Sequence, residues 1–580
     1  QTDEEEDIIS EQTRRSPVLT CLIHIVPIAA AVTLVGLNAS NYYVGGELEG
    51  LDGHDGKKLA ALAFAARLQE LFLLLSLATL AFSAYKFTKR TGMESLWISI
   101  LVICSVLGVF GGPAIGALMI PELGDWPAGG TPFWINATND MLFPESLEDS
   151  PGLQQCIAND RNLACPTGAW ESLAGGYLSL WPQLTGMGSV PQQVATPGKQ
   201  SVQIMNLRSR NANSLRDKMI WANAFTIATV PTSAAADALT EFGHLWTSAS
   251  ANGRIGRSKF RQDAIFTTVT EQPIVFVRCS QIIPSSAFLF PALNSLELDR
   301  SSTSATQLMA LARVGAHVPY SNVTTEALDS LLKSTRPSLL WISSPELLAA
   351  TNSTLAVVAS IPTSQHSRDL YTCSVDSRFA KTTLRATRNN PNYVSGDTLS
   401  KFDQLGPLTA EGRSIRLTTG WAKHLNPPLP DRSSTVFASL ASTAGLWNST
   451  VKSNPAYHEI IVENILATLI ANGIGRACYN TALLVDGYLK NPITDKGNGL
   501  WDGGEWVKEI LPKKGRMGSG GSAFIVPELE QQMATKLQMK AFVTGYAYTW
   551  SGNARKAAIG VLSVYSALAL LHIIYRIREG

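Results

Sequence analysis

The sequence has few charged residues. Asp, Glu, Lys and Arg together make up 16% of its 580 residues, whereas an ordinary soluble protein has roughly 25%. The two signs almost cancel, and the formal net charge is +1. A nucleic-acid-binding protein would show a basic face or stripe, so the balanced charge argues against that class. Because the shortage of charge is concentrated in long apolar stretches, the composition points to a membrane protein.

Several motifs of metal and nucleotide chemistry are also missing. There is no Cys-x-x-Cys pair, which disfavours zinc and thioredoxin chemistry. His458-Glu459 begins a predicted helix, but Val462 stands where the zinc signature His-Glu-x-x-His has its second ligand. Gly198-Lys199 lacks the upstream Gly and the following Ser or Thr of a phosphate-binding loop. We therefore predict no catalytic residues, no metal ligands and no cofactor.

Four apolar stretches are long enough to cross a bilayer. A span needs roughly 20 mostly apolar residues to cross about 30 Å of hydrocarbon. The stretches that meet this condition are residues 18–37, 62–85, 97–120 and 557–575. The sequence therefore predicts a membrane protein with four transmembrane α-helices and a large, β-rich α+β extracellular domain between the third and fourth helices.

Basic residues near the membrane predict the orientation of the spans. They form three groups: Arg14 and Arg15; Lys86, Lys89 and Arg90; Arg576 and Arg578. If all three groups are cytosolic, both termini are cytosolic and residues 38–58 and 121–555 lie outside. Four basic residues would then lie on the outer side: Lys57, Lys58, Arg555 and Lys556.

This orientation predicts the order of segments along the chain. They are an acidic cytosolic tail (1–17), a first span (18–37), a short outer loop (38–58), a second span (59–85), a cytosolic loop (86–96), a third span (97–120), the extracellular domain (121–555), a fourth span (557–575) and a cytosolic tail (576–580). The expected location is the plasma membrane or a membrane of the secretory pathway.

The segment 121–555 shows both strand and helix patterns. Residues 263–282, 355–361 and 369–386 are rich in Val, Ile, Phe and Thr, as β-strands are. Residues 457–475 show a broad apolar stripe at helical spacing. The stripe consists of Ile460, Ile461, Ile465, Leu466, Leu469 and Ile470. We predict an α+β domain, with two subdomains joined near residue 300 as an alternative.

Glycosylation triplets agree with an outside location for this segment. Asn136, Asn322, Asn352 and Asn448 each begin an Asn-x-Ser/Thr triplet. All four lie between the third and fourth spans, so we predict that these asparagines carry glycans.

Cysteine usage is compatible with an oxidising compartment. Cys156 and Cys165 are close enough in sequence to close a small loop. Cys279 ends one strand-like run and Cys373 lies in another, so these two could link a pair of strands. Cys478 would then be the unpaired one.

Two spans contain residues that are unusual in a membrane. In the second span, Arg67 and Glu70 lie on one helical face at i, i+3. They form either a polar site between helices or an ion pair that reaches water at the outer interface. In the third span, Gly108, Gly112 and Gly116 recur every four residues, a spacing that lets helices approach closely. The partner helix belongs either to the same chain or to a second copy.

One loop has acidic and aromatic residues together. Asp495, Asp502 and Glu505 lie in a Gly-rich stretch with Trp501 and Trp506. Paired carboxylates beside tryptophan could bind or cleave a glycan, and calcium is another conceivable ligand, although the spacing differs from that of an EF-hand. The alternative is a surface turn whose tryptophans pack inward.

Five segments carry a resemblance when taken together: Ala65–Leu71, Gln272–Cys279, Leu370–Phe379, Ile465–Arg476 and Gly545–Trp550. In this order they resemble a large family of uncharacterised multi-pass membrane proteins of filamentous fungi. Relatives often have Lys-x-His-Glu in the second span, where this chain has Arg67-Leu68-Gln69-Glu70. The resemblance implies a fungal cell-surface or secretory-membrane protein with a big extracellular domain, and it implies no activity.

We expect a cell-surface glycoprotein whose extracellular domain binds a ligand or partner, such as a wall polysaccharide or a protein. The first alternative is an oligomeric channel or transporter subunit, based on Arg67, Glu70 and the glycine face. The second is a membrane-anchored enzyme acting on glycans, based only on the acidic loop. The expected partners are the lipid bilayer, further copies of the chain and an extracellular polysaccharide or protein, and not nucleic acid.

Overall fold

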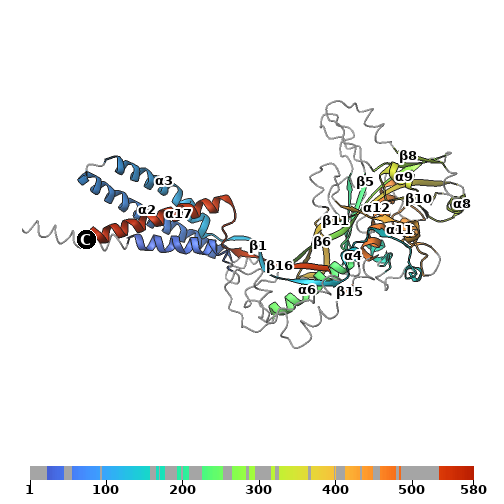
Figure 1. Ribbon diagram of the computed structural model, residues 1–580, viewed down its shortest axis with the longest axis horizontal. Helices are drawn as coiled ribbons and strands as arrows, with labels where there is room; N and C mark the ends of the chain where they lie inside the picture. Colours follow the sequence, from blue (N-terminus) through green and yellow to red (C-terminus); the bar gives the residue numbers. More distant parts are fainter. Residues whose placement is uncertain are drawn as a thin grey trace, which may run out of the picture.

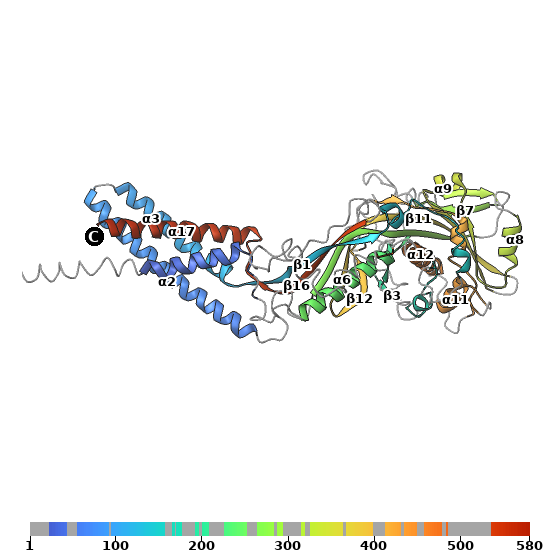
Figure 2. The same ribbon diagram turned by 60° about the horizontal axis from the view of Figure 1, so that its bottom comes forward.

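The structure of the protein is a computed structural model that describes part of the chain. The described residues are 23–42, 44, 55–91, 94–156, 165–168, 170–176, 192–196, 200–207, 225–251, 264–282, 287–293, 315–319, 325–363, 367–397, 399, 412–430, 434–448, 458–477, 483–484 and 535–579. The molecule is elongated, with a bundle of long helices at one end and a sheet domain at the other (Figure 1, Figure 2).

The described helices fall into these two regions. The bundle contains an apolar helix described over Ile23–Ala39 together with α2 (Asp55–Thr91), α3 (Glu94–Met119) and α17 (Asn553–Glu579). The sheet domain contains α4 (Asn139–Leu142), a 3-10 helix (Leu153–Gln155), α6 (Ser233–Ala251), α8 (Thr325–Lys333), α9 (Pro345–Thr351), α10 (Thr419–Lys423), α11 (Val436–Thr443) and α12 (His458–Ala477).

The four bundle helices pack through small and branched apolar residues. Their shared core includes Ala31, Leu73, Leu77, Ile115 and Leu562. The α2 helix is the longest of them at 37 residues, which is about 55 Å at 1.5 Å per residue. It is therefore longer than the hydrocarbon layer is thick.

One long apolar helix does not belong to the bundle. By length and composition α12 could cross a membrane, as α2, α3 and α17 could, but 94% of its most apolar window is buried inside the protein. A mainly apolar helix that is buried on all sides also fits the centre of a large domain. The prediction of a membrane protein with long apolar helices beside a mixed α+β domain is confirmed at the level of fold class, and the described part of the predicted first span is a shorter apolar helix, Ile23–Ala39.

The sheet domain is organised around one 12-stranded mixed sheet. Its main path runs β15-β1-β16-β6-β5-β4-β12-β11-β10-β9, with β3 beside β4 and β13 beside β11. The strands of this path are β1 (Glu122–Asn136), β4 (Gln200–Leu207), β5 (Phe225–Thr229), β6 (Ala264–Ile282), β9 (Ser338–Ile342), β10 (Leu355–Pro362), β11 (Arg368–Thr387), β12 (Asn390–Gly396), β15 (Leu483–Leu484) and β16 (Thr535–Ala547). The remaining strands are β2 (Ser146–Leu147), β3 (Gln192–Thr196), β7 (Ala287–Pro291), β8 (Gly315–Pro319), β13 (Arg413–Ser414) and β14 (Arg416–Leu417).

Two long strands, β6 and β11, form the centre of the sheet. They pair antiparallel without a break from Ile265 opposite Thr387 to Ile282 opposite Leu370. They come from opposite sides of residue 300, so that point does not divide the sheet. Val275, Val277 and Val375 are fully buried and belong to the same core as α12. The sheet and α12 therefore enclose the main core of the domain.

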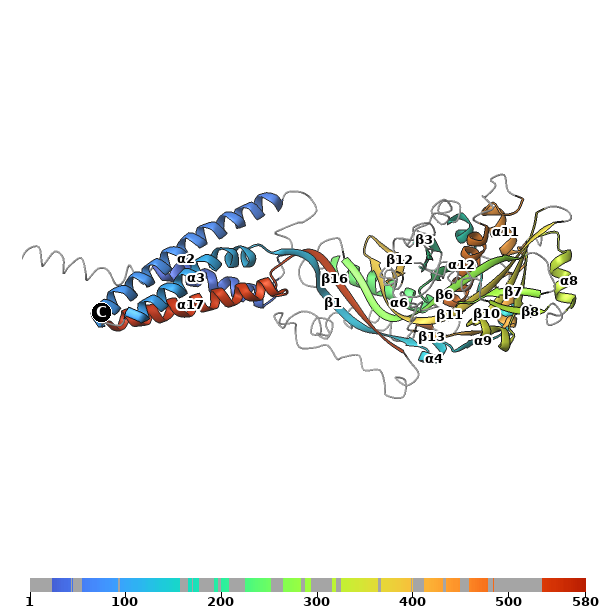
Figure 3. The same cartoon turned by 90° about the horizontal axis from the view of Figure 1, so that it is seen from above.

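A two-stranded ribbon connects the two regions. The α3 helix ends at Met119 and β1 begins at Glu122, whereas β16 ends at Ala547 and α17 begins at Asn553. Both strands pair antiparallel from Glu122 opposite Ala547 to Ile135 opposite Thr535. The inner half of β16 also pairs with β6. Figure 3 shows the ribbon leaving the bundle and curving into the sheet.

Candidate functional site

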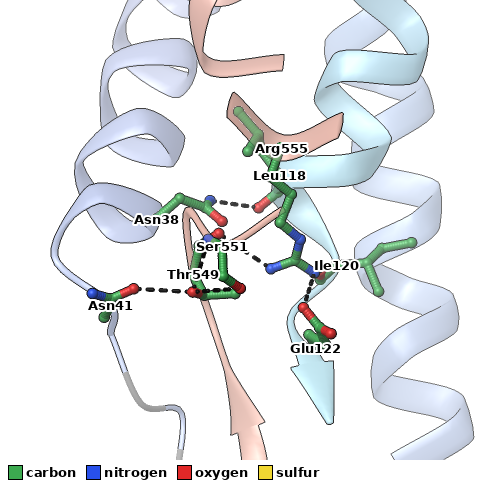
Figure 4. A network of polar contacts seen from close by, with 8 residues as sticks. All are labelled: Asn38, Asn41, Leu118, Ile120, Glu122, Thr549, Ser551 and Arg555. Atoms are coloured by element: carbon green, nitrogen blue, oxygen red, sulfur yellow. Dashed lines mark hydrogen bonds and ion pairs between the residues drawn. The ribbon is translucent and has the colours of Figure 1, made fainter. Parts of the chain in front are cut away.

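Three chain segments that are far apart in sequence meet where the bundle joins the ribbon. We call this region the neck, and it comprises residues 38–42, 44, 118–122 and 546–555 (Figure 4). Tyr548 N donates to Tyr42 O at 2.8 Å, and Val44 N donates to Tyr546 O at 2.9 Å. The segment after the first helix thus hydrogen-bonds to the end of β16, and the neck links three of the four bundle helices to the ribbon.

Two asparagines of the first segment hold the neck together. The Asn38 side chain is fully buried, and its Nδ2 donates to Leu34 O and to Leu118 O, both at 2.9 Å. Asn41 adopts a left-handed backbone conformation with φ 49°, and its Oδ1 accepts from Thr549 Oγ1 at 3.0 Å. The Asn38 amide thus reaches from its own helix to Leu118 O in the last turn of α3, where backbone carbonyls lack intrahelical partners.

An arginine closes the other side of the neck. Arg555 Nη1 donates to Thr549 O at 3.3 Å, and Nη2 donates to Ile120 O at 3.4 Å and lies 3.5 Å from Glu122 Oε2. Figure 4 shows the guanidinium pointing toward the turn between α3 and β1. In the predicted orientation this end of the bundle is the outer side, where the charge rule disfavours basic residues, and here the charge of Arg555 is used in local contacts.

The predicted polar pair of the second span forms an ion pair in the structure. Arg67 Nη1 lies 2.7 Å from Glu70 Oε2. The Arg67 side chain is 79% exposed and that of Glu70 is 24% exposed. Glu70 lies against Gly112 of α3, about 12 Å along the helix from the neck at Ile120. The ion pair therefore lies in the outer half of the bundle.

The glycine face of α3 is used for packing within the chain. A Cβ on Gly112 would lie 2.2 Å from Glu70 Oε1, and one on Gly108 would lie 3.4 Å from Leu74 Cδ2. A Cβ on Gly116 would have no neighbour within 4 Å. Two of the three predicted packing glycines thus accommodate side chains of α2.

The structure places two of the predicted glycosylation sites on the surface of the sheet domain. Asn352 ends α9 and Asn448 follows α11, and both are exposed with left-handed backbone conformations, φ 51° and φ 43°. Asn136 is the last residue of β1 and pairs with Leu483. Asn322 lies outside the described residues.

Both predicted cysteine pairs lie at disulfide distance. The sulfur atoms of Cys156 and Cys165 are 1.98 Å apart, and those of Cys279 and Cys373 are 2.11 Å apart. Cys279 and Cys373 stand directly opposite each other on β6 and β11. Cys478 lies outside the described residues, as do Asp495, Asp502 and Glu505 of the acidic loop.

One ion pair in the sheet domain contains a buried carboxylate whose pKa is shifted. Arg378 Nε donates to Asp376 Oδ2 at 2.7 Å, and both residues lie on β11. Burial raises the pKa of Asp376 above its ordinary value, while the Arg378 guanidinium opposes the rise. Burial likewise raises the pKa of Tyr371, and the carboxylates of Asp369 and Glu459 add to the effect. Within the described part of the chain, no group of three or more His, Cys, Asp or Glu residues could hold a metal ion.

The sequence interpretation missed a row of buried polar residues on α12. Asn464, Thr468, Asn472 and Arg476 recur every four residues, and none is more than 1% exposed. Asn472 Nδ2 donates to Pro166 O and to Gly168 O, and Arg476 Nε donates to Asn472 Oδ1. The i, i+4 spacing could have revealed this row beside the apolar stripe. The row attaches α12 to the carbonyls of Pro166 and Gly168, which lie outside the strands of the sheet.

It also missed two histidines in the membrane helices. His24 lies near the start of the first helix and His572 near the end of α17, and the two rings contact each other. Both positions fall inside spans that the sequence predicts, and ionisable residues in spans are rare. Their presence was therefore a usable signal.

Comparison with known proteins gives one match. Residues 319–474 match a family model described as the CLZ1 N-terminal domain, which is about a quarter of the chain. The matched region runs from the end of β8 almost to the end of α12 and therefore contains β11 and most of the buried helix. No curated protein and no solved structure matches the chain.

Proposed function

We propose that this protein is a cell-surface or secretory-membrane glycoprotein whose sheet domain binds an extracellular ligand or partner, either a wall polysaccharide or a protein. The observation that carries the proposal is the connection between the regions. The β1–β16 ribbon continues directly from α3 and into α17, and the neck fixes its membrane end.

An ordered connection has a thermodynamic cost that a flexible linker avoids. Fixing the backbone of one residue costs roughly 1–2 kcal/mol in conformational entropy. Here β16 is ordered over 13 residues, about 44 Å at 3.4 Å per residue, and residues 544–547 of it continue beyond the pairing with β6 toward the bundle. Such a ribbon holds the domain at a defined distance and orientation from the bundle. That is useful when the domain must present a surface to a large partner.

The proposed orientation places residues 121–555 outside, with spans at 18–37, 59–85, 97–120 and 557–575 and both termini in the cytosol. Exposed Asn352 and Asn448 and the two cysteine pairs support it, because glycosylation and disulfides both belong to the secretory route. The resemblance to multi-pass membrane proteins of filamentous fungi suggests that the membrane is that of a fungal cell.

Orientation is tested by removing the exposed acceptors. Digestion with a glycosidase should increase the electrophoretic mobility of the protein isolated from a eukaryotic host. The shift should shrink by one step in each of Asn352→Gln and Asn448→Gln. Ser353→Ala is the informative control, because it leaves the third triplet residue, Thr354, in place and should keep the glycan on Asn352. A protein without any glycan would contradict the proposed orientation.

The binding function is tested on the full chain. The glycosylated protein in lipid nanodiscs is presented with β-glucan, chitin, mannan and intact fungal cells, and empty nanodiscs serve as the control. We expect saturable binding to one of these that is lost when the protein is reduced, because the Cys279–Cys373 link joins the central strands. Absence of binding to every polysaccharide and to the cells would refute the proposal.

One observation favours a second function, that of an oligomeric channel subunit. The Arg67 side chain is 79% exposed in the outer half of the bundle, and a guanidinium there prefers a polar partner to lipid tails. A neighbouring copy could provide that partner. In planar bilayers such an oligomer would conduct, and Glu70→Gln would change its conductance. A monomer in native mass spectrometry would remove this alternative.

A further inference from the structure

Four polar side chains form a continuous hydrogen-bonded series through the interior of the bundle. Tyr565 Oη of α17 donates to Ser76 Oγ of α2 at 2.7 Å. Ser76 Oγ lies 2.6 Å from His24 Nδ1, and His24 Nε2 lies 2.8 Å from His572 Nδ1. His24 and Ser76 are fully buried, and Tyr565 is 1% exposed. The series therefore links three helices, with three of its members buried and His572 at its end partly exposed.

Helix geometry gives the depth of each member below the neck. Counted from the start of α17 at Asn553, Tyr565 lies about 18 Å and His572 about 28 Å down the helix axis. Counted from Asn41 along the first helix, His24 lies about 25 Å down. Two helices that run in opposite directions thus place both histidines near the far boundary of a hydrocarbon layer about 30 Å thick. The series leads from the middle of the bundle to its end away from the sheet domain.

Hydrogen counting shows what the histidine pair can accept. Ser76 accepts the Tyr565 hydrogen, so its own hydrogen can go to His24 Nδ1, and His24 Nε2 then donates to His572. In the opposite arrangement His572 donates to His24 Nε2 and His24 Nδ1 donates to Ser76. One additional proton fits either ring with the bond between the rings intact. With a second additional proton, both facing nitrogen atoms, His24 Nε2 and His572 Nδ1, would carry a hydrogen although they lie only 2.8 Å apart.

The neighbouring charged and titratable groups oppose the second proton. Arg576 lies one helical turn beyond His572, and its Nη2 donates to Ser83 Oγ of α2 at 2.9 Å. The other members of the series, Ser76 of α2 and Tyr565 of α17, carry no charge next to the histidines. The α3 helix contributes a buried thiol, Cys104, to the same core. Two imidazolium groups beside a guanidinium would repel one another strongly at low dielectric constant.

We propose that His24 and His572 form a proton-binding site that controls the attachment of the first helix to α2 and α17. The pair binds one proton with its contacts intact, and a second proton separates His24 from His572. In the described structure two other side-chain hydrogen bonds join the first helix to other helices: Gln69 Nε2 donates to Pro27 O at 3.0 Å, one helical turn from His24, and Asn38 Nδ2 donates to Leu118 O in the neck. These bonds and the apolar packing of the helix remain after the histidines separate, so the movement is confined to the end of the helix that contains His24.

The test measures the distance between the two helices as a function of pH. Spin labels replace the exposed residues Ile25 and Ile574 in full-length protein in nanodiscs, in a background without Cys21, Cys104 and Cys478. Measured from pH 7.5 downward, the interhelical distance should stay constant while the pair holds one proton and should increase only at acidic pH, where the second proton binds. This response should be lost in His24→Gln and in His572→Gln, because an amide keeps a hydrogen bond and takes no proton.

The matched control is a histidine of similar contact geometry in the other region. His424 Nε2 lies 2.8 Å from Asp149 Oδ1 in the sheet domain, and His424→Gln should keep the full response. A wild-type distance that does not change with pH would overturn the proposal. So would a response that persists in both bundle variants. If His24→Gln does not give a monodisperse protein at pH 7.5, the His572→Gln variant decides between these results.

Discussion

The helix bundle exposes many of its large hydrophobic side chains, whereas the sheet domain buries them. Most of the large hydrophobic side chains that are exposed belong to the bundle, among them Phe64 at 66%, Val109 at 69% and Ile577 at 68%. In the sheet domain, by contrast, large hydrophobic residues such as Trp246 and Phe437 are fully buried. The first region is built to face hydrocarbon and the second to face water.

This difference changes what holds each region together. In water, burial of apolar surface at about 25 cal/mol per Å² drives the sheet domain to fold. Between membrane helices that driving force is absent, so close packing and hydrogen bonds determine which helices meet. The bundle accordingly depends on a few specific contacts, such as Glu70 on Gly112 and His24 on Ser76. The predictions below test that contrast.

The largest effect should follow from removing a buried aromatic residue of the sheet domain. Trp421 lies on α10, is 1% exposed and belongs to the main core. Trp421→Ala should lower the free energy of unfolding of this domain by about 3–5 kcal/mol through lost burial and the cavity that remains. Urea unfolding followed by tryptophan fluorescence measures the change.

The matched control is Trp550→Ala. Trp550 is 53% exposed just before α17, and its replacement should change the unfolding of the sheet domain by less than about 0.5 kcal/mol. If the two variants lost equal stability, the contrast between buried and exposed aromatic residues would not hold for this protein.

A smaller effect is expected from filling the contact between α2 and α3. In Gly112→Leu the new side chain must displace Glu70, whose Oε1 would be 2.2 Å from the first added atom. Overpacking of this kind costs about 1–3 kcal/mol, and we expect a lower thermal midpoint in detergent. Gly116→Leu is the control, since a Cβ there meets no atom within 4 Å. Equal midpoints for the two variants would show that α2 and α3 do not pack as described.

Weakening the neck should make the backbone around it open more often. Arg555→Ala removes donors to Thr549 O and Ile120 O and the contact with Glu122. A hydrogen bond involving a charged group contributes about 1.5–3 kcal/mol, and these long bonds should lie at or below the lower limit. Amide exchange in residues 540–550 should then become about tenfold faster, which corresponds to about 1.4 kcal/mol. Lys556→Ala, which removes only a cation–π contact with Trp550, should leave the exchange rates unchanged.

Local patterns in the sequence predicted the elements better than the contacts between them. The strand-like run 369–386 is β11 to within one residue at each end, since a strand buried over much of both faces leaves a composition that can be read locally. The apolar stripe at 457–475 likewise predicted α12 inside the domain, although by length and composition alone this helix could cross a membrane. Nothing near Asn38 indicates that its amide bonds to Leu118, 80 residues further on. Such contacts depend on how the helices pack.

The smallest predicted effect tests whether the sheet domain tolerates a buried charge. Because burial raises the pKa of Asp376, the folded protein retains its proton to a higher pH than the unfolded chain does. The stabilisation is therefore complete below the ordinary pKa of 3.8 and is lost as the pH rises through the raised value. Asp376→Asn should remove this loss, so the stability of the wild type relative to the variant should fall between pH 3 and pH 6. Asp329→Asn removes an exposed carboxylate that pairs with Lys333 and should show no such trend. A difference that stayed constant with pH, or rose, would mean that Arg378 outweighs burial and that this region can hold a paired charge without a net cost.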